Sequence, residues 1–348
     1  MVWCSSFPED YSADRSGSRA FPTSSFRPPR AAARGRSRHL RSAADPVERT
    51  QENHGEPTTG ETAFVLSGGA SLGAVQAGML RALYERGIVP DLICGTSVGA
   101  LNGAFVAARE QTMATAEALG DVWRGLERRD VFPLSPLAGL MGLAGRRDAL
   151  VSERSLERLI HEHVGVETFR ETRVPLHLTA TDVLDGLEVR LSEGDLGDAV
   201  LASTAIPGVF PTVEWHGHEL MDGGVADNTP LSHAIELGAT EVYVLATGGP
   251  CVLPEPPRGA VPRIVNALAV LVRRRLVTEI DALGDGARLI VLPPPCPLDV
   301  SPNNFARAGE LIERSLLAAH EHLDALEDGG GTPMAPGHPL RPHVHARR

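Results

Sequence analysis

Two glycine-rich turns in the first third of the chain contain residues that could carry out nucleophilic chemistry. One of them, Gly95-Thr96-Ser97-Val98-Gly99, follows the short apolar run 92–94 and precedes a segment rich in Ala and Leu. Glycines on both sides of a serine allow a tight turn from a strand into a helix, which exposes the hydroxyl near the positive end of the helix dipole. The pattern predicts a nucleophile elbow with Ser97 as the nucleophile and Gly95 and Gly99 beside it. A glycine-rich turn without chemistry is the alternative, because G-x-S-x-G also occurs by chance.

The second turn, Gly68-Gly69-Ala70-Ser71-Leu72-Gly73, lies between the apolar run 63–66 and a helical pattern that ends at Gly87. Successive backbone N–H groups at the start of a helix bind a phosphate or a developing oxyanion. The turn lacks the Gly-Lys-Ser/Thr ending of a P-loop and the G-x-G-x-x-G spacing of dinucleotide-binding folds. We therefore interpret it as an oxyanion hole formed by the N–H groups of Gly68, Gly69 and Ala70.

A serine nucleophile needs a base, and Asp222 is the best-placed candidate. It ends an apolar stretch and is followed by Gly223 and Gly224, so its carboxylate is expected at the edge of a sheet with little around it. None of the histidines after Ser97 has a sequence context typical of a catalytic base. Two alternatives stay open at this point. One is a plain Asp-Gly-Gly turn, and the other is a Ser-His-Asp esterase in which a histidine acts as the base.

The elements around these motifs predict an α/β protein. Two consecutive strand–turn–helix units are typical of a parallel sheet with helices packed on it. Further strands are expected at 174–181, 187–191, 241–246 and 288–292, with a hairpin across Asp185-Gly186, and helices at 112–128, 153–163, 195–202, 261–277 and 304–326. We expect one folded domain at 61–326, with its core motifs in 62–250, between a disordered Arg/Ser/Pro-rich extension at 1–60 and a flexible tail at 327–348.

The segment 15–41 is rich in arginine and contains no acidic residue. Such a segment is typical of an organellar transit peptide or of a basic arm. The alternative is an unstructured extension, including one that results from a start site placed too early.

The amino-acid composition limits which kinds of partner this protein is expected to bind. The net charge of −11 argues against nucleic-acid binding, which needs a basic surface. The four cysteines include no C-x-x-C pair, so the sequence predicts no metal site. No apolar run reaches the roughly 18 residues that span a bilayer, and the N-terminus lacks the apolar core of a secretory signal, which favours a cytoplasmic protein. The apolar segments 131–145 and 261–277 raise the alternative of peripheral membrane contact, against simple packing into the core.

Four motifs, in this order, resemble the patatin-like phospholipase family. They are the glycine-rich loop at 68–73, the elbow at 95–99, Ala202-Ser203-x-Ala205-Ile206-Pro207, and Asp222-Gly223-Gly224. The resemblance covers residues 62–250 and extends more loosely to 326. It implies a three-layer α/β/α fold with a mostly parallel central sheet. It also implies a lipid acyl hydrolase that cleaves acyl esters with Ser97 as nucleophile and Asp222 as base, without metal or cofactor.

Two positions depart from the family's usual loop, because Ala70 stands in place of the third glycine and Leu72 in place of an arginine or lysine. The Ala70 N–H can still serve if the backbone there needs no positive φ. The missing cation is expected to weaken contact with anionic phospholipid head groups. On this hypothesis Leu72→Arg favours anionic lipids, which paired kinetics on an anionic and a neutral substrate would test. A non-catalytic lipid-binding or regulatory protein that kept the fold is a further alternative.

Overall fold

The computed structural model describes residues 61–132, 151–248, 256, 258–283, 286–296, 298 and 300–328. All of them belong to one compact unit within Asn53–Arg348. The predictions made for residues 1–60, for most of the apolar segment 131–145 and for nearly all of the tail 327–348 fall outside the described residues.

The centre of the unit is one sheet of eight strands. Five neighbouring strands are parallel, in the order β3 (Leu176–Asp182), β2 (Leu92–Thr96), β1 (Thr62–Leu66), β7 (Glu241–Leu245) and β8 (Arg288–Leu292). Three antiparallel strands complete it: β4 (Glu188–Leu191) and β6 (His218–Asp222) both pair with β3, and β5 (Val213–Trp215) pairs with β6. The sheet is therefore mostly parallel.

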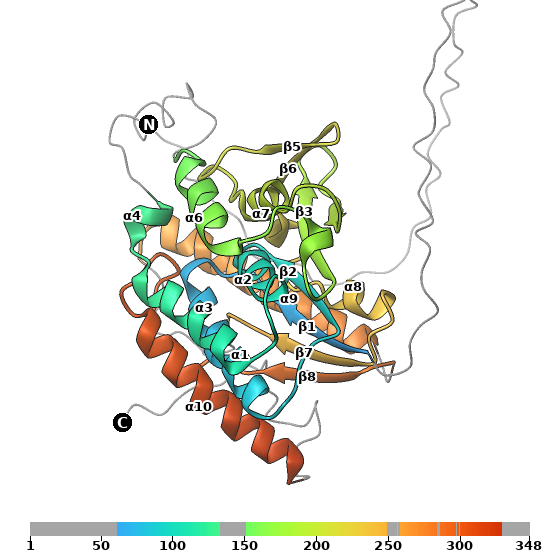
Figure 1. Ribbon diagram of the computed structural model, residues 1–348. Helices are drawn as coiled ribbons and strands as arrows, with labels where there is room; N and C mark the ends of the chain where they lie inside the picture. The colour runs from blue at the N-terminus through green and yellow to red at the C-terminus, as the bar shows by residue number, and fades with distance from the viewer. Residues whose placement is uncertain are drawn as a thin grey trace, which may run out of the picture. The chain divides into compact units, whose positions relative to one another are not determined.

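Helices cover both faces of this sheet, which gives the predicted three-layer α/β/α fold (Figure 1). One face carries α1 (Ala74–Glu85), α2 (Val98–Ala107), α3 (Met113–Gly125), α6 (Arg154–Val164), α7 (Leu196–Thr204) and α10 (Ala308–Glu327). The other carries α8 (Leu231–Glu236) and α9 (Ala260–Leu283). Short helical turns lie at α4 (Arg128–Val131), η1 (Ala70–Gly73), η2 (Phe169–Glu171) and η3 (Gly223–Val225).

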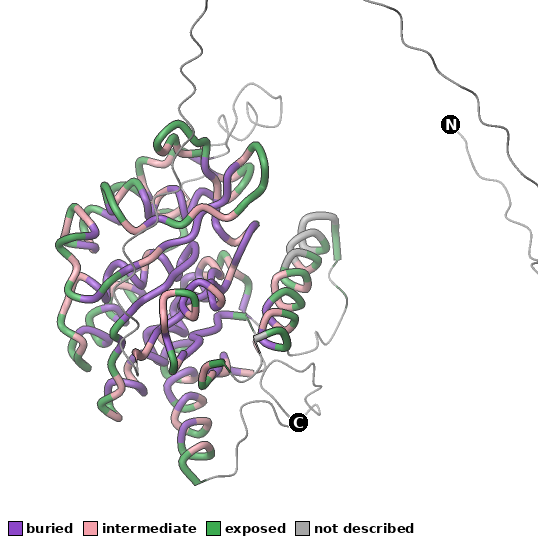
Figure 2. Tube along the Cα trace, turned by 90° about the vertical axis from the view of Figure 1, so that its right-hand side faces the viewer, coloured by how far each residue is buried: buried purple, intermediate pink, exposed green. Residues whose placement is uncertain are grey.

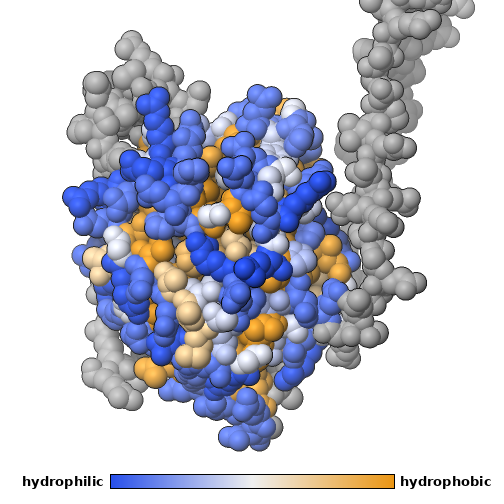
Figure 3. All heavy atoms as spheres, viewed as in Figure 1, coloured by the Kyte–Doolittle hydropathy of each residue, from blue (hydrophilic) through white to orange (hydrophobic). Residues whose placement is uncertain are grey.

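The two faces have separate cores because successive side chains of a strand point to opposite sides of a sheet. Along β1, Phe64 and Leu66 enter the larger core under α1, α2, α3 and α10. Ala63 and Val65 enter the smaller core under α8 and α9. The parallel strands are consequently buried on both sides, as the purple tube in the middle of Figure 2 shows. Hydrophilic side chains cover most of the outer face seen in Figure 3, where apolar residues form small groups.

Two strands that arrive from opposite directions share one edge of β3. Strand β2 pairs in parallel with residues 176–179, and β6 pairs antiparallel with residues 180–182. Strand β4 pairs with residues 178–181 and so occupies the other edge. The C-terminal ends of β2 and β6 therefore meet head to head, with Thr96 opposite Thr179 and Asp222 opposite Ala180.

Candidate active site

Ser97 lies at the turn between β2 and α2, in a backbone conformation that serine rarely adopts. Its φ is 55° and its ψ is −123°. A residue held in such a sparsely populated region costs about 1–3 kcal/mol, so the surrounding structure must enforce it. The enforcement comes from close packing at Gly99, where a Cβ would overlap the Leu66 carbonyl, and at Gly95, where a Cβ would overlap the Gly99 carbonyl. The elbow glycines thus let α2 start directly against the end of β1.

The head-to-head meeting of β2 and β6 brings Ser97 and Asp222 together. The Ser97 hydroxyl donates a hydrogen bond of 2.6 Å to Asp222 Oδ2. The other carboxylate oxygen, Oδ1, accepts a hydrogen bond of 2.7 Å from the Gly224 N–H. A Cβ at Gly223 would overlap the Thr179 carbonyl, so this glycine is needed where β6 ends against β3. Both oxygens of the carboxylate are therefore held in place.

Burial sets the proton affinity of this carboxylate. Ser97 and Asp222 are 7% and 6% exposed. Desolvation raises the pKa of Asp222 to about 6, while the hydrogen bonds from Ser97 and Gly224 partly oppose the rise. A carboxylate with this pKa is a stronger base than an exposed aspartate, and it is still mostly ionised at neutral pH.

The glycine-rich loop lies beside Ser97, but its N–H groups are not equivalent. The Gly68 N–H donates 3.0 Å to the Asn228 carbonyl, and a Cβ at Gly68 would approach the Ser97 Cβ to 3.1 Å. This differs from the role predicted for Gly68, because its N–H is already paired within the chain. In the described part of the chain, no hydrogen bond occupies the N–H of Gly69 or Ala70. An oxyanion hole at this loop would therefore use these two groups.

Ala70 and Leu72, the two residues that depart from the family's usual loop, do not meet the expectations drawn from the sequence. Ala70 has a φ of +51°, so the condition that its backbone needs no positive φ is not met. A Cβ in this left-handed region costs about 1 kcal/mol relative to glycine. Leu72 is only 8% exposed and packs into the larger core, so an arginine at this position would have to bury its charge or displace the loop. The burial of Leu72 therefore argues against the predicted gain in anionic-lipid preference for Leu72→Arg.

Comparison with known proteins identifies the family of the segment that contains these residues. Residues 64–235 match the family model described as patatin-like phospholipase. This part of the chain belongs to the patatin-like phospholipase family. The neuropathy target esterase sws of Drosophila melanogaster is 28% identical over 187 residues, which cover 53% of this chain and 13% of that protein. The lysophospholipase nte1 of Aspergillus terreus is 28% identical over 192 residues, which cover 53% and 12%.

The chain thus spans only about an eighth of the length of these two curated relatives. Among solved structures, the heterodimeric ExoU–SpcU complex of Pseudomonas aeruginosa superimposes with a TM-score of 0.39 at 19% identity. The match covers 76% of this chain and 51% of that one.

Sequence reasoning missed one residue that supports Ser97. Ser203, which is completely buried in α7, accepts a 2.9 Å hydrogen bond at its Oγ from the Ser97 N–H. Its own hydroxyl donates 2.6 Å to the Thr179 carbonyl on β3. Ser203 therefore ties the strained elbow to β3, the strand with which the end of β6 that carries Asp222 is paired. The signal was present in the Ala202-Ser203-x-Ala205-Ile206-Pro207 motif, which had no role assigned to it.

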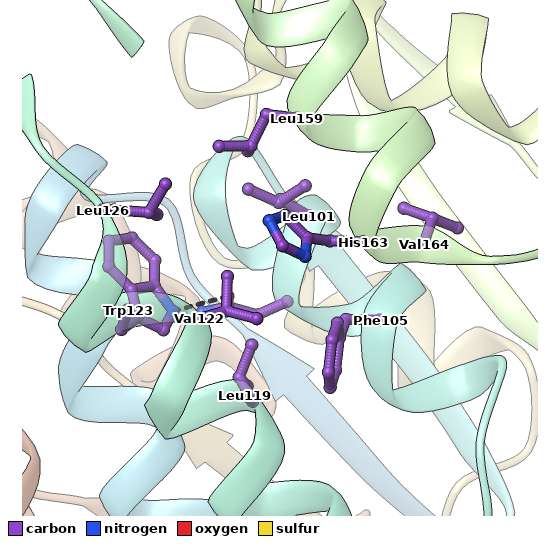
Figure 4. Close-up of a pocket in the computed structure, with 10 residues that line it drawn as sticks. Leu101, Phe105, Leu119, Val122, Trp123, Leu126, Leu159, His163 and Val164 are labelled. Atoms are coloured by element: carbon purple, nitrogen blue, oxygen red, sulfur yellow. Dashed lines mark hydrogen bonds between the residues drawn. The ribbon is translucent and has the colours of Figure 1, made fainter. Parts of the chain in front are cut away.

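A chain of three buried side chains behind the loop was also missed. Trp123 Nε1 donates 3.0 Å to Asn102 Oδ1, a contact that Figure 4 marks with a dashed line beside a small apolar pocket. Asn102 Nδ2 donates to Gln76 Oε1 (2.7 Å) and to the Gly73 carbonyl (3.0 Å). Gln76 Nε2 in turn donates to the carbonyls of Ser67 (2.9 Å) and Leu245 (3.0 Å).

These contacts brace both ends of the glycine-rich loop of the patatin-like domain. Ser67 precedes Gly68, and Gly73 ends η1. Gln76 and Asn102 are completely buried, and both side-chain amides have partners for their nitrogen and oxygen atoms. Fully satisfied buried polar networks make a structure rigid, because leaving any member unpaired is costly. The loop is thereby fixed relative to α2, the helix that begins after Ser97.

The described histidines are placed elsewhere, and none of them hydrogen-bonds to Ser97. His177 and His233 pack against each other on the α8 face, with ring centroids 5.1 Å apart. His218 contacts Asp182 at 2.7 Å, and His320 contacts Glu85. Across the described ranges, no group of three or more His, Cys, Asp or Glu side chains is arranged to hold a metal ion.

Proposed function

We propose that this protein is a lipid acyl hydrolase that cleaves carboxylic esters, with Ser97 as nucleophile and Asp222 as base. The observation that carries the proposal is the 2.6 Å hydrogen bond between Ser97 Oγ and Asp222 Oδ2 in a buried site. The site lies in the segment 64–235 that matches the patatin-like phospholipase model.

In the first step, Ser97 Oγ attacks the ester carbonyl carbon while its proton passes to Asp222 Oδ2. The raised pKa of Asp222, about 6, makes this transfer easier than it would be for an exposed aspartate. The negative charge that develops on the carbonyl oxygen is received by the N–H groups of Gly69 and Ala70. One such donor contributes roughly 3 kcal/mol to the transition state, and the positive end of α2 favours the same charge.

In the second step, the tetrahedral intermediate collapses and the carbon–oxygen bond to the alcohol breaks. The alcohol takes the proton from Asp222, and the acyl group stays on Ser97 as an ester. Water then enters, gives a proton to Asp222 and attacks the acyl carbonyl. The fatty acid leaves as Ser97 recovers its proton. None of these steps requires a metal ion or cofactor.

The family, and the names of two relatives, one an esterase and the other a lysophospholipase, support a lipid ester as the substrate. We infer that the protein acts on phospholipids, lysophospholipids or simpler esters in the cytoplasm, at the surface of a membrane. No helix within the described ranges is both long and apolar enough to cross a bilayer. Fractionation of cells followed by immunoblotting tests the cytoplasmic and peripheral location, and recovery only with a secreted or organellar fraction would refute it.

A fluorophosphonate probe provides the direct test, because it reacts with an activated serine. The wild-type protein should be labelled at Ser97, and Ser97→Ala should not be labelled at all. Hydrolysis of p-nitrophenyl esters, lysophospholipids and phospholipids should then rank the substrates. A folded wild-type protein that is neither labelled nor active on any of these esters would favour the non-catalytic lipid-binding alternative. Loss of activity in a histidine variant, with full activity in Asp222→Asn, would favour a triad.

A further inference from the structure

Helix α9 connects two parallel neighbours, β7 and β8. A helix in such a crossover runs antiparallel to the strands, so its N-terminal end lies at the edge of the sheet where the strands end. Ser97 lies at that same edge, directly after β2. The helix has 24 residues and the strands have five. At 1.5 Å and about 3.3 Å per residue, these lengths are about 36 Å and 17 Å, so α9 must extend beyond the sheet.

An ion pair indicates which end extends. Arg275 Nη2 lies 3.9 Å from Asp227 Oδ2. The Asp227 carbonyl accepts a 2.9 Å hydrogen bond from Thr96 Oγ1, and Thr96 is the residue before Ser97. Arg275 is therefore close to the level of the strand ends. Among the α9 residues whose burial is described, the buried ones are Leu276 and Ile280, and both come after Arg275.

The projecting part of α9 is residues 260–274, which precede this level. In Figure 2 the lower end of this helix carries the buried colour, and the described residues above it are exposed or intermediate. Leu271 is 63% exposed, Ala267 and Ala269 are exposed, and Val270 and Val272 are half-buried. An exposed apolar helix end of this kind marks an interaction surface.

The charge of this region contrasts with that of the whole chain. Between Glu255 and Glu279 the sequence contains no acidic residue, although the chain has a net charge of −11. The projecting part ends in a run of arginines, of which Arg273 is half-buried and Arg274 is exposed. A helix that combines exposed apolar residues with clustered arginines is suited to a surface with an apolar interior and anionic head groups.

We propose that the projecting part of α9 rests on an anionic lipid surface and turns the Ser97 edge of the sheet toward it. Leu271 and its apolar neighbours enter the boundary between head groups and acyl chains, and Arg273 and Arg274 lie at the lipid phosphates. The inference rests on the proposed function only in taking lipid as the substrate. Its test is a binding measurement that needs no turnover.

The experiment uses the full chain with Ser97→Ala, so that no lipid is consumed. Co-sedimentation is measured with vesicles of phosphatidylcholine and with vesicles that also contain phosphatidylglycerol. The double change Arg273→Glu/Arg274→Glu should weaken binding to the anionic vesicles at least tenfold, because each arginine near an anionic surface contributes to binding. Leu271→Ser should weaken it several-fold without changing the charge. High salt should weaken wild-type binding as well.

The matched control is Arg170→Glu/Arg173→Glu. Both residues are exposed and lie just before β3, at the opposite edge of the sheet, and the change in net charge is the same. This control should bind anionic vesicles as the parent does. Equal weakening by both double variants would overturn the proposal, because it would show a response to net charge alone. Unchanged binding in both α9 variants would also overturn it.

A second readout separates the possible failures. With Ser97 restored, the α9 variants should hydrolyse a water-soluble ester at the parent rate and vesicle lipid at least tenfold more slowly. If Arg273→Glu/Arg274→Glu loses both activities and its native circular-dichroism spectrum, that variant is misfolded and Leu271→Ser becomes the test. Unchanged vesicle binding by Leu271→Ser would then overturn the proposal.

Gel filtration tests whether the surface joins two copies of the chain. If wild type dimerises, the α9 variants do not, and no vesicle binding is seen, the surface is a dimer interface and the proposal is wrong. Vesicle binding that depends on α9, in a protein without esterase activity, would refute the proposed function and leave this inference standing.

Discussion

The two faces of the sheet differ in whether their buried polar side chains are hydrogen-bonded. On the face covered by α1, α2 and α3, the buried side chains of Gln76, Asn102 and Trp123 are joined into one satisfied network. Within the described residues, the buried side-chain nitrogen and oxygen atoms that lack a hydrogen-bond partner all belong instead to the face of α8 and α9 or to the segment leading to it. These atoms are Thr179 Oγ1, Asp227 Oδ2, His233 Nδ1 and Glu279 Oε2.

The two aspartates near the site illustrate what this difference means. Burial raises the pKa of Asp222 to about 6 and that of Asp227 to about 7, where Glu279 adds to the rise. Both oxygens of Asp222 are hydrogen-bonded, so its position relative to Ser97 is fixed. Only one oxygen of Asp227 has such a bond, from the Thr229 N–H. The first face thus holds its buried polar groups at fixed distances, while the second leaves several described polar atoms without a hydrogen bond.

The largest expected effect distinguishes the two aspartates by activity. Ser97→Ala and Asp222→Asn should each lower kcat/KM for ester hydrolysis by roughly a thousandfold or more, because they remove the proposed nucleophile and the proposed base. Asp227→Asn should keep activity within a few-fold. Steady-state kinetics on a p-nitrophenyl ester, with circular dichroism as the folding control, provides the measurement. A drop of similar size in Asp227→Asn would show that Asp227 is as important for activity as Asp222.

The pH dependence should follow Asp222. The carboxylate must be ionised to accept the proton, so kcat/KM should fall about tenfold per pH unit below about 6. The free energy of unfolding should change in the opposite direction to kcat/KM and rise as the pH falls, because the folded protein favours the neutral form of Asp222. The stabilisation is present below the unfolded pKa of about 4 and is lost as pH rises through about 6, a change of about 3 kcal/mol.

Asp222→Asn provides the control for this pH prediction, because it should flatten that part of the stability profile. Urea unfolding between pH 4 and 8 measures the effect. A stability profile that has the same shape in both proteins would show that Asp222 is not the group that titrates.

The network behind the glycine-rich loop should affect turnover more than binding. Trp123→Phe keeps the ring but removes the donor to Asn102, so we expect kcat to fall about tenfold and KM to change less than twofold. This corresponds to about 1.4 kcal/mol, within the range of one buried hydrogen bond. Tyr84→Phe is the matched control, because it also removes one aromatic donor, which makes a 2.6 Å hydrogen bond from α1 to Gln111, away from the loop. Equal melting temperatures with unequal kcat would show that the network acts on turnover, whereas equal kcat would mean that the network serves stability alone.

The smallest effect concerns Ala70. Replacing it with glycine should stabilise the protein by about 1 kcal/mol, since glycine adopts a positive φ without a Cβ clash. The N–H group that we assign to the oxyanion hole is kept, so kcat should stay within about twofold. Thermal unfolding and kinetics of Ala70→Gly measure both quantities. A loss of stability would contradict the left-handed backbone at this residue.

Local pattern was enough to predict most elements of the fold. The strand expected at 288–292 is β8, and the run 63–66 lies within β1. The expected hairpin across Asp185-Gly186 joins β3 and β4. The predicted ends of the helices agree less well with the structure. Helix α10 begins at Ala308 instead of 304, and α9 continues to Leu283 instead of 277. Packing against the rest of the molecule decides where an apolar periodic segment stops being helical.

The residues able to react could be found from the sequence, because glycine spacing around Ser97 and after Asp222 is a local property of a turn. Their partners could not, because those come from distant parts of the chain. The Asn228 carbonyl that occupies the Gly68 N–H is 160 positions away, and Gln76, Asn102 and Trp123 converge from three helices. The buried position of Leu72 and the positive φ of Ala70 likewise depend on how the loop packs. Hydrogen-bond partners and burial are set by contacts between distant segments, which a local pattern does not encode.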